Sequence, residues 1–226
     1  LNKLKMHAAG DIGCYTLGNA MPLDMVDTCL CMGAGLNIAQ GVEKVEPDTT
    51  CFAFVGDSTF FASAITGVVN AVYNQANMVL IVLDNSTTAM TGHQPHPGTG
   101  QTVMGEIVQK INIEQVLRGI GVTEIETINP LELEASVSCV KRMAEKSGVR
   151  AIIFKAPCIA VTKPKAPLHV NQDSCIGCKK CIRDLGCPAI VMNDGKICID
   201  ASMCTGCHLC SQVCPVCAIA GGDNHE

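Results

Sequence analysis

The stretch CFAFVGDSTFFASAITGVVNAVYNQANMVLIVLDN, residues 51–85, decides the fold. CFAFV (51–55) at its start and MVLIVLDN (78–85) at its end are short apolar runs stopped by glycine or polar residues, which is typical of buried strands. Residues 59–75 between them are apolar, rich in small side chains and long enough for a helix. Two buried strands joined by a helix predict a parallel sheet.

The residues after this stretch continue the alternation. We expect a loop over 91–100, a helix over 111–119, a strand over 122–127, a helix over 130–146 and a strand over 150–155. Strands alternating with helices predict an α/β fold in which helices cover both faces of a parallel sheet. Ligands of such sheets bind beyond the carboxyl ends of the strands, where Asp57 and Asn85 are placed.

The composition changes after Ala156. Residues 157–170 contain three prolines and two lysines without periodicity, and we interpret them as a linker between domains at 1–156 and 171–226. The second domain carries an internal repeat, DSCIGCKKC…CPAI (173–190) and ASMCTGCHLC…CPVCAI (201–219), with an Asp-Gly hairpin signal between the copies. We expect a small α+β domain of the ferredoxin type.

Ten of the sixteen cysteines lie between Cys175 and Cys217. The second copy reads C-x2-C-x2-C-x3-C-P, the run of bacterial two-cluster ferredoxins, in which the fourth cysteine ligates the other cluster. Zinc sites also use Cys-x-x-Cys pairs, but a doubled run with both prolines favours two [4Fe–4S] clusters. The pattern assigns the first cluster to Cys175, Cys178, Cys181 and Cys214, and the second to Cys204, Cys207, Cys210 and Cys187.

The first copy departs from the run, because five residues instead of three separate Cys181 from Cys187. This insertion lengthens the link between the clusters and removes no ligand. Cys198 and Cys217 are surplus to the two sets, and we interpret both as packing residues.

The composition also narrows the class of protein. A net charge of −5 argues against a nucleic-acid surface. The longest apolar run, 78–83, is too short to span a membrane, and the first residues hold no apolar stretch long enough for a signal peptide. With this cysteine usage, the expected location is a reducing compartment, the cytoplasm.

Residues 56–85 resemble the thiamine diphosphate motif, in which Gly-Asp-Gly is followed further along the chain by Asn. The resemblance implies that the side chains of Asp57 and Asn85 and the carbonyl of Thr87 bind Mg²⁺, whose oxygen shell the diphosphate and water complete. Ser58 stands where the motif has its last glycine. For this motif alone, an ordinary turn at the end of a strand remains the alternative.

Three further segments extend the likeness: DIGCYTLG (11–18), DTCLCMGAGLNIAQG (27–41) and TGHQPHPGTG (91–100). With the cysteine-rich end, they resemble the 2-oxoacid:ferredoxin oxidoreductase superfamily, closest to the α subunits of indolepyruvate ferredoxin oxidoreductases. The resemblance covers nearly the whole chain and implies a thiamine diphosphate-binding fold. It also implies oxidative decarboxylation of an aryl 2-oxoacid to acyl-CoA and CO₂, with electrons passed through the clusters to an external ferredoxin.

Those α subunits are longer, and upstream they carry a pyrimidine-binding domain and a Cys-Pro-Gly-Cys segment. The resemblance therefore implies that this chain is part of a larger assembly with a second (beta) subunit. Thiamine enzymes take the glutamate that promotes ylid formation from a different domain. Glu124 and Glu126 lie far along the chain from the cofactor motifs, and the other glutamates, Glu226 included, are in solvated stretches. We expect the chain to be inactive without a separate pyrimidine-binding domain.

The residues expected at the cofactor are Asp11, Gly13, Cys14, Gly33, Gly56, Asp57, Ser58, Asn85, Thr87 and Gly92. Cys14 lies where the family places a cysteine near the thiazolium ring, and the alternative is a buried small hydrophobe. His93 is placed to contact diphosphate or substrate, and the alternative is a solvated loop histidine; His96 receives less weight. Gly33 allows either close cofactor approach or helix packing.

Two other functions stay open. One is an electron-transfer module on a non-catalytic α/β scaffold, and the other is a non-oxidative thiamine-dependent decarboxylase with structural clusters. Measuring thiamine and Mg²⁺ content distinguishes the electron-transfer module from a thiamine-dependent oxidoreductase. Measuring whether the substrate reduces the clusters distinguishes the non-oxidative decarboxylase from that oxidoreductase. The choice among indolepyruvate, pyruvate, phenylpyruvate and branched-chain 2-oxoacids also stays open.

Overall fold

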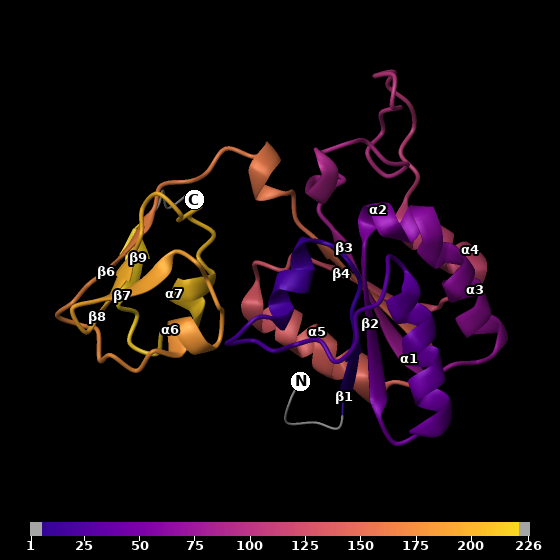
Figure 1. Ribbon diagram of the computed structural model, residues 1–226, viewed down its shortest axis with the longest axis horizontal. Helices are drawn as coiled ribbons and strands as arrows, with labels where there is room; N and C mark the ends of the chain where they lie inside the picture. The colour runs from indigo at the N-terminus through magenta and orange to yellow at the C-terminus, as the bar shows by residue number, and fades with distance from the viewer. Residues whose placement is uncertain (1–5, 222–226) are drawn as a thin grey trace. The chain divides into compact units, whose positions relative to one another are not determined.

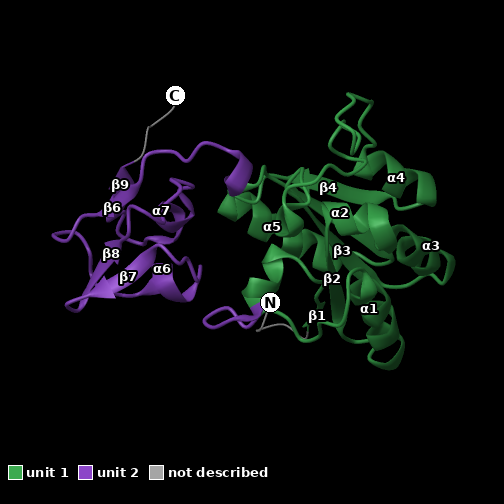
Figure 2. Ribbon diagram, turned by 45° about the horizontal axis from the view of Figure 1, so that its top comes forward, with its two compact units in different colours: residues 1–18, 25–158 green, residues 19–24, 159–226 purple. Residues whose placement is uncertain are grey.

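A computed structural model describes residues 6–221 of the chain. Contacts between residues divide it into two compact units (Figure 2). Within the described range, unit 1 comprises residues 6–18 and 25–158, and unit 2 comprises residues 19–24 and 159–221. No helix within the described range is long and apolar enough to cross a membrane.

Unit 1 is built on a five-stranded sheet with the order β1-β2-β3-β5-β4 (Figure 1). The strands are β1 (Met6–Ala9), β2 (Thr50–Gly56), β3 (Met78–Asp84), β4 (Glu124–Ile128) and β5 (Val149–Lys155). All four pairings are parallel. The predicted α/β class is confirmed. The apolar run MVLIVLD forms β3, the central strand, which is buried on both faces and therefore carries apolar side chains on both.

Helices cover both faces of the sheet. One face packs against α1 (Ala34–Val45), α3 (Ile65–Tyr73) and α4 (Ile113–Ile120) through Ala53, Val55, Leu80 and their neighbours. The other face packs Phe52, Val79 and Ile81 against α5 (Leu133–Glu145). Alternate residues of β2 thus enter different cores, as the period of a strand requires.

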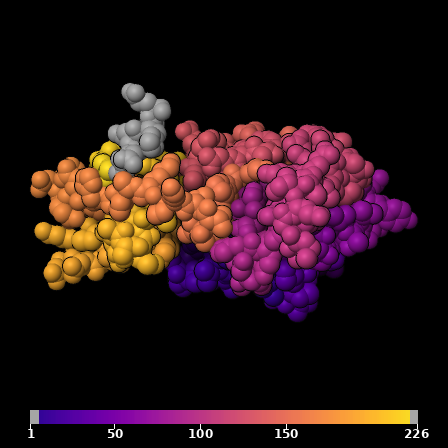
Figure 3. All heavy atoms as spheres, turned by 90° about the horizontal axis from the view of Figure 1, so that it is seen from above, coloured from indigo at the N-terminus to yellow at the C-terminus, as the bar shows by residue number. Residues whose placement is uncertain are grey.

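The helix predicted over 59–75 begins immediately at the end of β2. It is formed by α2 (Asp57–Thr59), a π-helical turn (Phe60–Ala64) and α3 in direct succession. Asp57 therefore lies at the first helical residue after a parallel strand, where its side chain faces the carboxyl edge of the sheet. The loop after β3, residues 91–110, forms part of the outer surface of unit 1 (Figure 3).

Unit 2 contains two small antiparallel pairs. The predicted hairpin is present as β7 (Ile190–Asn193) and β8 (Lys196–Ile199), and its turn residues Asp194 and Gly195 have φ of 48° and 77°, as a two-residue type I′ turn requires. The second pair joins β6 (Leu168–Val170) to β9 (Ile219–Gly221). Strand β6 lies inside the range that we interpreted as a linker. The sequence did not reveal this strand, because its partner β9 comes from the far end of the chain.

Candidate functional site

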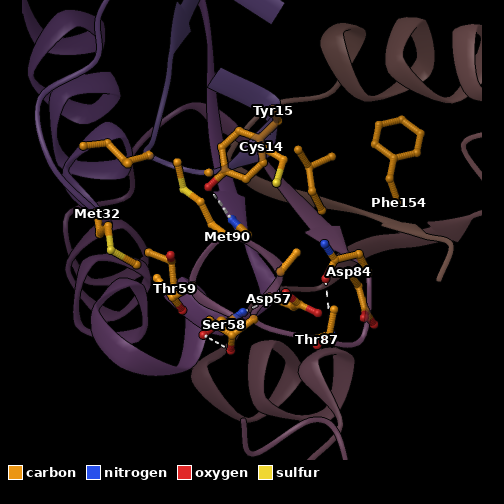
Figure 4. Close-up of a pocket in the computed structure, with 18 of the residues that line it drawn as sticks. Cys14, Tyr15, Met32, Asp57, Ser58, Thr59, Asp84, Thr87, Met90 and Phe154 are labelled. Carbon is orange, nitrogen blue, oxygen red and sulfur yellow. Dashed lines mark hydrogen bonds between the residues drawn. The ribbon is translucent and has the colours of Figure 1, made fainter. Parts of the chain in front are cut away.

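A cavity of about 310 Å³ opens at the carboxyl ends of β2, β3 and β5 (Figure 4). The segment after β1 contributes a wall that includes Tyr15. Of the residues expected at a cofactor, the cavity brings together Gly13, Cys14, Gly56, Asp57, Ser58, Asn85 and Thr87. Asp11, Gly33, Gly92 and His93 are outside its lining.

Asp57 is 3% exposed and is held from three sides. Its Oδ1 accepts a hydrogen bond from the backbone N–H of Ser58 at 2.8 Å. Its Oδ2 accepts one from the N–H of Ser86 at 2.7 Å and lies 3.1 Å from Nε2 of His96. Within residues 6–221, no lysine or arginine pairs with this carboxylate. A buried carboxylate without a cation is costly, so the site would gain from a bound metal ion.

Asn85 and Thr87 follow β3 at the neighbouring strand end. The side-chain oxygen of Asn85 accepts the N–H of Thr87 at 3.1 Å, which folds the loop over the cavity. The hydroxyl of Thr88 donates to Oγ of Ser58 at 2.9 Å and so ties this loop to the start of α2. Carboxylate, amide and carbonyl oxygens are the ligands that Mg²⁺ prefers, and this set fits that ion.

His96, which received less weight than His93 from the sequence, contacts the buried carboxylate of Asp57. Its Nδ1 accepts the N–H of Gly98 at 3.2 Å, so Nδ1 carries no proton and the ring proton of neutral His96 is on Nε2. Nε2–H therefore donates to Asp57. The ring also stacks on Phe61 with a centroid distance of 5.8 Å. No spacing rule signals this contact, which joins residues 39 positions apart.

His93 has a different environment. Its side chain is exposed, its φ is 62°, and its backbone N–H donates to the carbonyl of Thr88 at 3.0 Å. Gly92, with φ of 116°, ends the 3₁₀ turn Ala89–Thr91. Both residues shape the loop beside the cavity.

Asp11 does not line the cavity but is linked to two of its lining residues, Tyr15 and Gly56, by a chain of hydrogen bonds. Its Oδ1 accepts the N–H of Gly33 at 2.7 Å, and its Oδ2 accepts the hydroxyl of Tyr15 at 2.6 Å. The Tyr15 oxygen in turn accepts the N–H of Gly56 at 2.9 Å. Burial, reinforced by the Asp11 carboxylate, raises the pKa of Tyr15 well above its usual range. Tyr15 is therefore a fixed neutral donor that anchors the turn before Asp57.

Gly33 and Cys14 have different surroundings. A Cβ at Gly33 would lie 2.4 Å from Oγ of Ser63, and φ is 85°, so this glycine permits close helix packing. Cys14 is exposed and lines the cavity, which does not match a buried small hydrophobe.

The acidic lining is limited to aspartates. Asp57 and Asp84 line the cavity, and none of the glutamates in residues 6–221 does. Asp84 is already paired, since its Oδ2 lies 3.2 Å from Nζ of Lys155. Glu226 lies outside the described residues. The described residues thus leave the cavity without the glutamate expected to promote ylid formation.

In unit 2 the two cysteine runs adopt the same backbone. Gly177 and Gly206 have φ of 63° and 68°, and Lys179 and His208 have φ of 59° and 61°. Each run then enters a short helix, α6 (Lys180–Arg183) or α7 (Leu209–Val213), that carries the third cysteine. The sequence repeat is therefore also a structural repeat.

The first set of predicted cluster ligands lines one cavity: Cys175, Cys178, Cys181 and Cys214. The fourth member comes from the second run, as the crossed pattern requires. Its sulfur accepts the N–H of Ala218 at 3.2 Å, an interaction of the kind that tunes cluster ligands.

The second predicted set shows a weaker association, through the pKa of Cys210. Burial raises this pKa to about 11, and the thiols of Cys207, Cys187 and Cys204 add to the effect. Cys187 of the first copy therefore acts electrostatically on a cysteine of the second run. Neither Cys198 nor Cys217 lines the cavity of the first set. Four soft thiolates per set fit an iron–sulfur cluster.

The chain matches a family model described as "Thiamine pyrophosphate enzyme, C-terminal TPP binding domain" over residues 11–154. Among curated proteins it is similar to the indolepyruvate oxidoreductase subunit IorA of Archaeoglobus fulgidus, with 40% identity over 91% of this chain and 34% of that protein. The subunit of the same name from Methanothermobacter thermautotrophicus is 42% identical over 92% of this chain and 34% of its own length. The chain thus spans about a third of the length of these relatives.

Among solved structures, the fold is similar to a 2-oxoglutarate:ferredoxin oxidoreductase from Magnetococcus marinus, determined with 2-oxoglutarate, coenzyme A and succinyl-CoA bound. The TM-score is 0.63 at 19% identity, over 72% of this chain and 58% of that one. At this identity the likeness shows the fold alone.

Proposed function

Because this chain belongs to the family of thiamine pyrophosphate enzymes with a C-terminal TPP-binding domain, we propose that it is the diphosphate-binding and electron-storing part of a 2-oxoacid:ferredoxin oxidoreductase. One observation carries the proposal. The buried carboxylate of Asp57 shares a cavity with Asn85, in a chain that also carries two four-cysteine runs, and the first predicted set of four cysteines lines a second cavity.

In this proposal Mg²⁺ is held by Oδ1 of Asp57, the side-chain oxygen of Asn85 and the carbonyl of Thr87. Oδ2 of Asp57 already accepts two hydrogen bonds, from Ser86 and His96, whereas Oδ1 accepts one. Oδ1 therefore keeps a free lone pair for the metal. When bound, thiamine diphosphate supplies the carbanion chemistry by which a 2-oxoacid loses CO₂.

The two sets of four cysteines in unit 2 would hold two [4Fe–4S] clusters, and such clusters would supply the oxidant. Together they would accept the two electrons released when the decarboxylated substrate is oxidised, and the final acceptor would be an external ferredoxin. Coenzyme A takes the acyl group. The names of the similar curated proteins favour indolepyruvate or a related aryl pyruvate as substrate, and the cytoplasm is the proposed location.

We also propose that another domain or subunit completes the site. In residues 6–221 no glutamate lines the cavity, so the group that activates the aminopyrimidine must come from elsewhere. A pyrimidine-binding domain, with the second (beta) subunit, would supply it and would close the cavity against water.

The proposal is tested by mixing the full assembly, loaded with clusters, thiamine diphosphate, Mg²⁺ and coenzyme A, with candidate 2-oxoacids. We expect aryl pyruvates to bleach the visible absorption of the clusters, and we expect no bleaching without thiamine diphosphate or from these 226 residues alone. Release of CO₂ without bleaching would instead indicate a non-oxidative decarboxylase. Failure to bind thiamine diphosphate would indicate an electron-transfer module.

His96 offers a sharper test of the metal site. Replacing His96 with phenylalanine keeps an aromatic ring against Phe61 but removes the donor to Asp57. Partners of metal ligands are typically worth about 10- to 100-fold in metal affinity, and we expect a loss of this order in Mg²⁺-dependent thiamine diphosphate binding.

The matched control is His93→Phe, because His93 is exposed and outside the cavity lining. Its cofactor affinity should equal that of the unchanged chain if His93 contacts the substrate, and should fall only if His93 contacts the diphosphate. If His96→Phe binds the cofactor as tightly as the unchanged chain, measured by titration calorimetry, then His96 does not position Asp57.

A further inference from the structure

The two cysteine loops of unit 2 differ in how they meet solvent, although they share one backbone geometry. We call residues 175–181 the first loop and residues 204–210 the second loop. In the second loop, a Cβ on Gly206 would lie 2.7 Å from both the carbonyl of Ala166 and Cβ of Lys165. The N–H of Lys165 also donates to the carbonyl of Thr205 at 3.2 Å. Residues 165–166 therefore cover the second loop.

The first loop has no such cover. At Gly177, the equivalent glycine, nothing lies within 4 Å of the position that a Cβ would take. Cys178 is exposed, whereas its counterpart Cys207 is partly buried. Ile176 is 64% exposed although it also lines the cavity of the first cysteine set. An external carrier can therefore approach more closely at the first loop than at the second. Since electron transfer slows steeply with distance, transfer should be faster at the first loop.

Three cations lie in or just after the first loop and outnumber the two adjacent carboxylates, Asp173 and Asp184, in a chain whose net charge is −5. Lys179, Lys180 and Arg183 are all exposed. Arg183 donates from Nη2 to the carbonyl of Cys178 at 3.3 Å, which holds its charge over the loop. In the described part of the chain, none of the three cations forms an ion pair with a carboxylate.

We propose that Ile176, Cys178, Lys179, Lys180 and Arg183 form the docking surface for a small acidic one-electron carrier, so that the first cluster is the exit point for electrons. The inference rests on the proposed function, which places a cluster on the first cysteine set. An apolar centre with a cationic rim fits a carrier whose own redox group is ringed by carboxylates. In the step itself the reduced cluster loses one electron and the carrier gains one, with no bond broken and no proton moved.

The test reverses charge at each loop in turn. Lys180→Glu with Arg183→Glu changes the first loop, and Lys163→Glu with Lys165→Glu makes the same change beside the covered second loop. The chain is loaded with clusters, reduced by dithionite and mixed with an oxidised acidic [2Fe–2S] ferredoxin. Electron transfer is followed by stopped flow, and association is measured separately by titration.

We expect the first pair to lower the second-order rate constant and the affinity by about tenfold or more and to flatten their dependence on salt, since steering by opposite charge is lost. The second pair should stay close to the unchanged chain. With cytochrome c, a basic carrier, the first pair should instead accelerate transfer. Lys180→Glu alone leaves the Arg183 contact in place and should show a smaller effect of the same sign.

Equal effects from the two pairs, or a larger effect from Lys163→Glu with Lys165→Glu, would overturn the docking surface. Iron and sulfide content separates this failure from that of the proposed function. A chain with two intact clusters and charge-insensitive transfer refutes the surface alone. A chain that assembles no cluster refutes the cluster assignment, and this inference with it.

Discussion

Replacing Asp57 with alanine is expected to abolish Mg²⁺-dependent binding of thiamine diphosphate and to leave both clusters intact. Asp57 is the one charged ligand that we assign to the metal; it lines the cavity, and its Oδ1 accepts only one hydrogen bond. Removing a residue that hydrogen-bonds to a metal ligand typically lowers metal affinity by about 10- to 100-fold. Removing the ligand itself should therefore lower the affinity by more than about a hundredfold. The cysteines proposed to bind the clusters lie in the other compact unit, which this substitution does not touch.

The measurement is a titration of thiamine diphosphate at fixed Mg²⁺, with iron and sulfide assayed in the same sample. Asp57→Asn is the companion variant, because it keeps the side-chain volume and removes the charge. Both variants should lose binding and keep their iron. A thiamine diphosphate affinity equal to that of the unchanged chain in either variant would refute this loop as the metal site.

Replacing Cys187 with alanine is expected to remove the second cluster and spare the first. Cys187 belongs to the first copy of the repeat by sequence, but the crossed pattern assigns it to the set of Cys204, Cys207 and Cys210, and its thiol contributes to the raised pKa of Cys210. Iron should therefore fall from about eight to about four atoms per chain. Cys217→Ala, at an exposed cysteine outside both sets, is the control and should keep all of its iron.

Double variants identify which cluster is lost. Cys204→Ala added to Cys187→Ala should remove no further iron, because both changes strike one cluster. Cys175→Ala added to Cys187→Ala should remove the remainder. The opposite pattern would show that each copy of the repeat holds its own cluster and that the crossed assignment is wrong.

The elements of unit 1 could largely be read from the sequence because their signals are local. The apolar run at β3 is continuous since the strand is buried on both faces, and the run at β2 stops at Gly56 where the chain turns into α2. Strand β1 escaped prediction because its four residues are too few to show a period. The helix expected from Pro130 begins at Leu133, after Asn129 has accepted the N–H of Leu131 in a turn.

The candidate site was predictable only in part. Asp57 and Asn85 follow adjacent parallel strands, so their meeting at one edge of the sheet follows from the strand order. Nothing comparable links Asp57 to His96 or Asp11 to Gly33, since loops bring these pairs together. For the same reason the sequence favoured His93, and the structure placed His96 against the carboxylate.

The sequence by itself determined the α/β class, the strand ends that carry Asp57 and Asn85, and the repeated cysteine loops, because each depends on residues close together in the chain. Only the tertiary structure decided which histidine holds Asp57, that residues 19–24 belong with unit 2, and that residues 165–166 cover one cysteine loop and leave the other bare. These features are contacts across long sequence separations. Their free energy comes from packing and hydrogen bonds between distant segments, and neither periodicity nor motif spacing records which segments will meet.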